Sequence, residues 1–152
     1  MCLLWFKKNK IKKMYSTKKQ INQLSYEILN CAIEVHKALG AGLLESIYEK
    51  CFIFELKSRG FEVESQVKIP LIYKENKIDC DLRLDVIVEK TIIVELKAVE
   101  KILPIHEAQI LTYLKLLDLP KGILVNFNST NIVKYGQQTF VTEKFRKLPD
   151  GY

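Results

Sequence analysis

The segment from Arg83 to Lys97 constrains the fold more than any other part of the chain, because it contains two runs with the strand period of two. If the two runs form a hairpin, one face carries six apolar side chains: Leu84, Val86, Val88, Ile92, Val94 and Leu96. The opposite face carries a mixed set: Arg83, Asp85, Ile87, Ile93, Glu95 and Lys97. The pattern therefore predicts a strand pair with one core-facing side and one largely polar side.

The position of the turn decides which polar side chains meet. With a turn at residues 89–91, Asp85 lies directly across from Glu95, and the two carboxylates repel each other. A bound divalent cation would remove that repulsion, and Lys97, one pleat away, suits a reaction on phosphate. A two-residue turn would instead shift the pairing by one residue and separate the carboxylates. For a hairpin taken alone, a solvated face of alternating charges is the better-supported interpretation.

Length and charge set the broad class of the protein. The chain has 152 residues, of which 48% are hydrophobic, and this suits one domain with a sizeable core. No apolar run approaches the length of a membrane span, and we expect no secretory signal peptide. Seven of the 24 basic residues lie in residues 1–20 without an acidic residue, so the remaining 17 nearly balance the 18 acidic ones. Such an arm either holds phosphate non-specifically or acts as a solubilising extension, and we favour the extension.

The four cysteines, Cys2, Cys31, Cys51 and Cys80, include no Cys-x-x-Cys pair and no histidine spacing typical of zinc. This usage predicts a reducing, cytoplasmic compartment. Met14 is a second candidate for the native start, so whether residues 1–13 belong to the native protein is left open.

The remaining pattern predicts an α/β protein. Apolar residues at helical spacing predict helices at 21–39, 43–59 and 104–117. Strand-like runs occur at 61–69, 71–74, 78–88, 91–98, 122–127 and 132–135, with a turn at 75–77 inside a three-strand meander. This order predicts a mixed sheet that packs between helices.

Three further polar groups have two interpretations each. His106, Gln109 and Tyr113 share a stripe of the third helix that would contact a phosphate or orient a strand end, although spacing alone favours an ordinary helix surface. Glu45 is either a helix-capping residue after Gly42 or another carboxylate near the metal, and spacing alone favours capping. The position of His36, taken alone, indicates an ordinary histidine at the surface or boundary of a helix.

Several motifs together resemble a known family. The segment Gly42-Leu43-Leu44-Glu45-Ser46-Ile47-Tyr48 resembles the pattern of the GxxExxY proteins, which belong to the PD-(D/E)XK nuclease superfamily. The resemblance extends over roughly residues 20–140 and includes the segments 35–40, 83–85, 95–98, 108–114 and 126–127. Leu84 stands where the superfamily's name has proline.

The resemblance implies a fold and a division of the chain. The fold is a restriction-endonuclease-like α/β core, that is, a mixed β-sheet flanked by α-helices. The nuclease-like domain would span residues 20–141, between a basic, flexible tail at 1–19 and a C-terminal tail at 142–152.

The resemblance also implies roles for single residues. Asp85 and Glu95 would bind Mg²⁺ or Mn²⁺, together with a backbone carbonyl near Leu96, and Lys97 would assist the attacking water. Glu45 would support the metal or accept a proton. Nucleic acid would be positioned by the pair Gln109 and Tyr113 and by Arg83, and His36 would have a supporting role.

We therefore expect a metal-dependent phosphodiesterase that acts on nucleic acid, with DNA favoured over RNA and no membrane partner. The alternative is a non-catalytic module that keeps the nuclease fold and binds nucleic acid or protein. A homodimer, endo- or exonucleolytic action, sequence preference and pathway are left open by the sequence.

Overall fold

Residues 83–97 lie in the middle of a five-stranded sheet. The structure is a computed structural model that describes residues 14–152. The strands, in spatial order, are β1 (Val63–Lys68), β4 (Arg83–Val88), β5 (Ile92–Lys97), β6 (Lys121–Asn126) and β7 (Gln137–Val141). Only β5 and β6 are parallel, and the other neighbours are antiparallel. The predicted mixed sheet is confirmed. Residues 1–13, which make up most of the predicted basic tail and include Cys2, lie outside the described residues.

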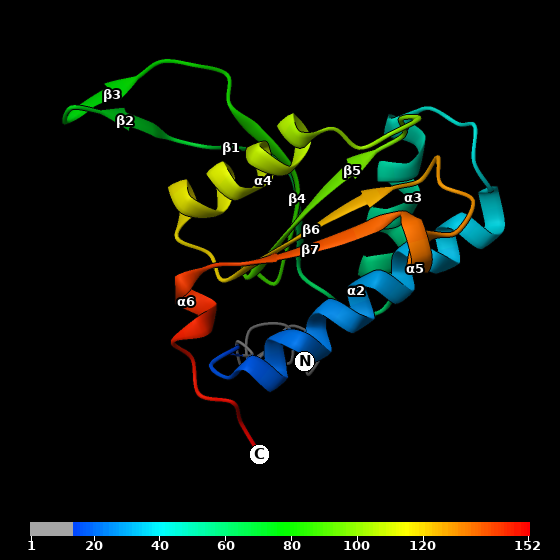
Figure 1. Ribbon diagram of the computed structural model, residues 1–152, viewed down its shortest axis with the longest axis horizontal. Helices are drawn as coiled ribbons and strands as arrows, with labels where there is room; N and C mark the ends of the chain where they lie inside the picture. The colour runs from blue at the N-terminus through cyan, green and yellow to red at the C-terminus, as the bar shows by residue number, and fades with distance from the viewer. Residues whose placement is uncertain (1–13) are drawn as a thin grey trace, which may run out of the picture.

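Helices cover both faces of this sheet. α2 (Lys18–Leu39) and α3 (Glu45–Ser58) pack on one face, and α4 (Pro104–Leu117) packs on the other (Figure 1). α2 begins where the Thr17 hydroxyl accepts a hydrogen bond from Gln20 N, and its apolar residues recur every three to four positions. α4 begins at a proline, which fits the first turn of a helix, and both of its ends agree with the prediction.

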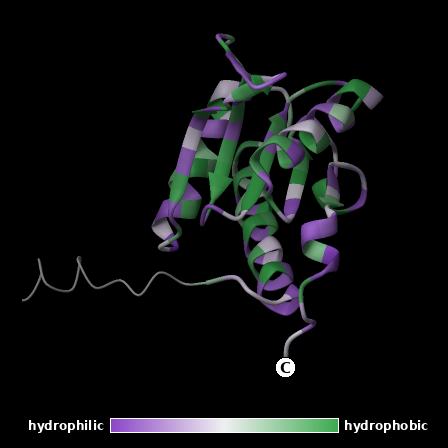
Figure 2. Cartoon of the chain, turned by 90° about the vertical axis from the view of Figure 1, so that its left-hand side faces the viewer, coloured by the Kyte–Doolittle hydropathy of each residue, from purple (hydrophilic) through white to green (hydrophobic). Residues whose placement is uncertain are grey.

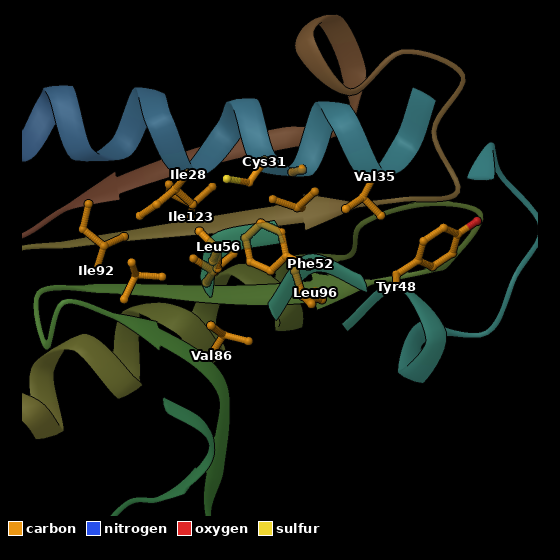
Figure 3. Close-up of a cluster of buried hydrophobic side chains, with 14 of the residues drawn as sticks. Ile28, Cys31, Val35, Tyr48, Phe52, Leu56, Val86, Ile92, Leu96 and Ile123 are labelled. Carbon is orange, nitrogen blue, oxygen red and sulfur yellow. The ribbon is translucent and has the colours of Figure 1, made fainter. Parts of the chain in front are cut away.

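The larger core cluster lies between the sheet and the α2–α3 layer. Figure 3 shows side chains of α2, α3 and the strands meeting there, among them Ile28, Cys31, Phe52, Leu56, Val86, Leu96 and Ile123. In Figure 2 the strands are mostly hydrophobic, whereas the helices alternate between hydrophobic and hydrophilic residues. This alternation is the expected signature of helices with one face on a core.

The second cluster, under α4, corrects the predicted polar face of the hairpin. Ile87 and Ile93 are buried there against Ile110 and Leu114 of α4. Leu84, which was expected with the larger cluster, belongs to this second one. The hairpin is thus buried on both faces along most of its length, as is usual for strands that take part in parallel pairing. Only its open end keeps polar side chains.

The register of the hairpin agrees with the three-residue turn. Val88 pairs with Ile92, and Val86 pairs with Val94. The turn closes through a hydrogen bond of 3.0 Å from Thr91 N to Val88 O. Continued by one position, this register brings Asp85 opposite Glu95, as predicted.

The predicted meander is wrong in one part. β2 (Leu71–Tyr73) and β3 (Asn76–Ile78) form a separate two-stranded sheet that projects from the body of the molecule (Figure 1). The expected strand 78–88 is therefore broken after Ile78, and the turn lies at residues 74–75 instead of 75–77. Most side chains of this hairpin are exposed, so within residues 14–152 it does not share in the core that holds β4 in the main sheet.

The predicted strand at 132–135 is a short helix, α5 (Ile132–Tyr135), whose Asn131 side chain accepts a hydrogen bond from Lys134 N. The last strand of the main sheet, β7, begins at Gln137, just after this helix. α6 (Glu143–Arg146) comes next, and the last residues return to the start of α2, where Lys18 N donates to Pro149 O. Across residues 14–152, no helix is long and apolar enough to cross a membrane.

Candidate functional site

The strand pair β4–β5 opens at the end that carries the two carboxylates. Backbone pairing of β4 with β5 ends at Val86 and Val94. Beyond this pair, backbone N–H groups donate to side-chain carboxylate oxygens instead. Asp85 N donates to Glu95 Oε1 at 3.0 Å, and Leu96 N donates to Asp85 Oδ2 at 2.9 Å. Each carboxylate is therefore held by a backbone N–H of the opposite strand. One oxygen of each remains for a further ligand.

Burial and mutual repulsion outweigh the positive charge of Lys97 at this pair of carboxyl groups. The Glu95 side chain is 3% exposed. Burial, followed by the neighbouring Asp85 charge, raises the pKa of Glu95 to about 8, although the Asp85 N–H and Lys97 act in the opposite direction. A buried carboxylate beside another one is costly unless a cation accompanies it. The geometry thus favours occupation by a cation.

The start of α3 brings Glu45 to the same place. Burial raises the pKa of Glu45; the charges of Asp85 and Glu49 add to this effect, and Lys97 opposes it. The expectation that Gly42 caps this helix is wrong, because Leu44 is the N-cap residue and Glu45 is the first helical residue. The charges of Asp85 and Lys97 therefore act on Glu45, which is the first residue of α3 and does not follow a Gly42 cap.

Tyr48, the last residue of the motif around Glu45, fixes the loop that leads into α3. Its ring is buried and stacks on Phe127, with 4.6 Å between ring centroids. Its hydroxyl donates to Gly40 O and accepts from Leu43 N at 3.1 Å. These contacts hold the chain between α2 and α3, so Tyr48 positions Glu45.

Two site residues were missed by the sequence-based prediction. Glu49 follows Glu45 by one helical turn, and Gln66 of β1, which has a positive φ of 50°, lies between Ser65 and Val67, the residues that pair with Val86 and Leu84 of β4. Gln66 Nε2 donates to both oxygens of Glu49, at 2.9 and 3.2 Å. Burial raises the pKa of Glu49, the Gln66 hydrogen bond opposes this effect, and the Asp85 charge adds to it. The spacing of four residues from Glu45 was the available signal for Glu49, whereas Gln66 had none.

The polar stripe of α4 divides into two parts. Gln109 Nε2 donates to Tyr113 Oη at 2.8 Å. Burial, then the Glu95 charge and more weakly the Asp85 charge raise the pKa of Tyr113, and the Gln109 hydrogen bond opposes them. His106 faces away from this pair: its Nδ1 accepts from Leu103 N at the start of the helix.

The other two predicted residues have different partners. The exposed Arg83 forms an ion pair with Asp81, with 2.6 Å between Nε and Oδ1. His36 Nε2 is 2.8 Å from Ser129 O, so this histidine contacts the loop that follows β6.

The carboxylates of Asp85 and Glu95 suit an ion such as Mg²⁺, which keeps several water ligands, better than an ion whose ligands all come from the protein. Within residues 14–152, no three His, Cys, Asp or Glu side chains are close enough to enclose a metal together. Mg²⁺ commonly binds through one or two carboxylates and keeps several waters or substrate phosphates. Asp85 and Glu95 supply two carboxylates. The Leu96 carbonyl points into the same opening, because N–H and C=O of one strand residue face the same neighbour.

Comparison with known families assigns the chain. A family model of the PD-(D/E)XK nuclease superfamily matches residues 22–139. Comparison with curated proteins and with solved structures finds no match. The matched region runs from α2 into β7 and contains the whole carboxylate site and its helices. The mixed sheet flanked by helices is the restriction-endonuclease-like architecture that the sequence predicted. The chain belongs to the PD-(D/E)XK nuclease superfamily.

Proposed function

We propose that this protein is a metal-dependent nuclease that hydrolyses phosphodiester bonds, with DNA favoured over RNA. The observation that carries the proposal is the reciprocal hydrogen bonding of Asp85 and Glu95 at the open end of the central strand pair. The superfamily implies a nucleic-acid substrate. The segment at 42–48, with Tyr48 fixing the loop before Glu45, supports placing the chain among GxxExxY-type members.

Asp85 and Glu95 are the proposed ligands of Mg²⁺ or Mn²⁺, with the Leu96 carbonyl as a third ligand. When bound, such an ion polarises a phosphate oxygen and lowers the pKa of a coordinated water. Glu45 supports the ion through water or accepts the proton of the attacking water.

Lys97 is the proposed catalytic cation. It follows Glu95 by two positions on β5, so both side chains lie on the same face of the sheet. Its ammonium group orients the water or stabilises the charge that develops on phosphate oxygens. The water oxygen bonds to phosphorus, the bond from phosphorus to the leaving oxygen breaks, and the products are a phosphate end and a free hydroxyl.

Residues around this centre would position the strand. Gln109 and Tyr113 present a hydrogen-bonded amide and hydroxyl next to Glu95, and Arg83 lies at the start of β4. His36 would support these residues indirectly, through the loop after β6.

Other parts of the proposal concern the setting of the protein. The family match supports a nuclease domain at residues 20–141. Cys31, Cys51 and Cys80 are free thiols, which agrees with the proposed cytoplasmic location. A homodimer remains a hypothesis that the size of the protein in solution would test.

The test is cleavage of labelled single- and double-stranded DNA, and of RNA, with Mg²⁺ or Mn²⁺ and with chelator. We expect metal-dependent cleavage that Lys97→Ala reduces by at least about 10²-fold. Lys90→Ala is the matched control, because Lys90 is an exposed lysine at the turn of the same hairpin. Equal residual cleavage by wild type and Lys97→Ala would mean that a contaminant is responsible and that the proposal is wrong.

The second candidate function is a non-catalytic module that binds nucleic acid or protein. It is favoured by the near balance of charge beyond residue 20, where 17 basic residues face 18 acidic ones. Metal binding separates the two functions, because only the nuclease requires an ion that depends on Asp85 and Glu95.

A further inference from the structure

A cavity lies beside the carboxylate site, on the same face of the sheet. Its volume is about 290 Å³, and it is enclosed by the ends of β6 and β7, by α5 and by the loop before α4. This volume is near the lower limit of small-ligand pockets, about 300–1,000 Å³. The cavity therefore suits one planar heterocycle better than a duplex.

The strand register fixes where the cavity lies relative to the site. Glu95 pairs with Leu124, and Leu124 pairs with Gln138. Paired residues on adjacent strands point to the same face, so these three form one row across the sheet. Two strand spacings separate Glu95 from Gln138, roughly 10 Å. A nucleotide next to a phosphate at the carboxylate site would reach this row.

The walls of the cavity are held in place. Asn126 is buried, its Oδ1 accepts from Val99 N at 3.1 Å, and its Nδ2 donates to Val99 O at 2.9 Å. This side chain ties the loop before α4 to the end of β6. At Gly136 an added Cβ would lie 2.8 Å from Ser129 Cβ and 2.9 Å from Asn126 O, so the backbone there is packed tightly. The cavity is therefore a pre-formed part of the fold.

Among the groups that line the cavity, which include Glu100 and Leu124, Tyr135, Gln138 and Lys101 are of the kinds that bind nucleotides. Tyr135 is 74% exposed. Within residues 14–152, the side chains of Tyr135, Gln138 and Lys101 have no hydrogen-bond or ion-pair partner. An aromatic ring stacks on any base, an amide offers both a donor and an acceptor to a base edge, and a lysine neutralises phosphate.

We propose that this cavity is a nucleobase subsite that takes an unpaired base of the nucleic-acid strand, with Tyr135 stacking on the base and Gln138 bonding its edge. Its part in cleavage rests on the proposed nuclease function, since the base would belong to a nucleotide adjacent to the bond that is cut. Its binding of a base does not depend on cleavage. A site of this kind favours single-stranded or frayed ends over intact duplex.

The test is fluorescence anisotropy with a labelled single-stranded oligonucleotide and a series of the same strand with one abasic position moved along it. Binding is measured with Mg²⁺ in a Lys97→Ala background, so that the strand is not consumed. Tyr135→Ala should weaken binding of the intact strand by about tenfold, which is the effect of losing one stacked base. Tyr135→Phe should retain binding. One abasic position should weaken binding by a similar factor, and Tyr135→Ala should add no further loss on that strand.

The matched control is Tyr26→Ala, because Tyr26 is an exposed tyrosine on α2, outside the cavity. Equal losses from Tyr26→Ala and Tyr135→Ala would overturn the subsite. Independent, additive losses from Tyr135→Ala and from every abasic position would do so as well.

Cleavage by the otherwise wild-type protein separates this inference from the function that it rests on. Cleavage that depends on metal but is indifferent to Tyr135→Ala and to abasic positions would support the nuclease and overturn the subsite. Base-dependent binding without cleavage under any metal would support the subsite and count against the nuclease.

Discussion

The two hairpins of this protein have similar turns and opposite surroundings. The β4–β5 turn has positive φ at Glu89 and Lys90, 53° and 51°, and the β2–β3 turn has positive φ at Lys74 and Glu75, 47° and 67°. Yet β4 and β5 lie at the centre of the main sheet, whereas β2 and β3 pair only with each other. Similar local geometry thus occurs in the most buried and in one of the most exposed parts of the molecule.

The difference shows what allows a hairpin to hold a buried carboxyl group. A lone two-stranded hairpin is only marginally stable in water. β4–β5 is covered by helices on both faces, and this burial stabilises it enough to keep Glu95 out of solvent next to Asp85. The exposed hairpin has no such support. Substitutions at equivalent places should therefore have unequal effects.

The largest expected difference concerns activity. Asp85→Asn should lower kcat by at least about 10²-fold, because it removes one of the two negative charges proposed to hold the ion. Asp79→Asn, just after β3, should leave kcat within about twofold of wild type. Steady-state cleavage assays at saturating metal compare the two variants. Similar losses in both would mean that Asp85 has no special role.

The next difference concerns pH and stability in chelator. The pKa of Glu95 rises from an ordinary 4.5 to about 8 on folding, so between these values the folded state binds a proton that the unfolded state does not. Stability from this group is complete below pH 4.5 and is lost as pH rises toward 8, with a slope on the order of 1 kcal/mol per pH unit. Urea unfolding from pH 5 to pH 8 should show this slope in wild type.

Glu95→Gln is the matched variant for this measurement, because it keeps the shape of the side chain and cannot ionise. It should have a shallower slope, because only Glu45 and Glu49 of the raised carboxyl groups remain, and it should be more stable than wild type at pH 8 without metal. Addition of Mg²⁺ should recover stability in wild type alone, because the ion binds only the ionised pair. An identical slope in both proteins would show that Glu95 does not titrate as described.

The core contribution of the two hairpins is compared by removing one isoleucine from each. Ile93 is fully buried in β5 beneath α4, and Ile72 is 68% exposed in β2. Ile93→Ala should lower the free energy of unfolding by about 2–5 kcal/mol. Ile72→Ala should change it by less than about 0.5 kcal/mol. Chemical denaturation measures both, and a large effect of Ile72→Ala would show that the exposed hairpin folds as part of the core.

The smallest difference concerns the turns themselves. A residue other than glycine at positive φ is strained, so glycine there relieves strain but gains entropy in the unfolded chain. Lys90→Gly should raise the free energy of unfolding by up to about 1 kcal/mol; it also removes an exposed ion pair with Glu62 that contributes little. Glu75→Gly should leave global stability unchanged, because the exposed hairpin opens locally. Equal changes in the free energy of unfolding for Lys90→Gly and Glu75→Gly would show that the two turns contribute to global stability in the same way.

The central hairpin was largely predictable from the sequence. The period of two and the turn at 89–91 gave the correct register, so the meeting of Asp85 and Glu95 is confirmed. The limits of α4 followed from Pro104 and the helical spacing after it. In both cases the deciding interactions lie close together along the chain.

Two of the parts that were missed depend on contacts that are distant in sequence, whereas the third was decided by a local helix cap. The short apolar run Ile132–Tyr135 fits a strand or a helix equally well, and Asn131 at its start decided for the helix. Leu84 packs beneath α4, a placement that a period of two along β4 does not reveal. Gln66 meets Glu49 only because β1 lies beside β4 and beneath α3.

The most direct test of the central claim is a calorimetric titration of Mn²⁺ into wild type, Asp85→Asn and Asp79→Asn. If Asp85 and Glu95 form the metal centre, wild type and Asp79→Asn bind the ion and Asp85→Asn does not. Mg²⁺ should compete for the same site. Absence of binding in wild type, or binding that persists unchanged in Asp85→Asn, would contradict the assignment of the carboxylate pair as a metal centre.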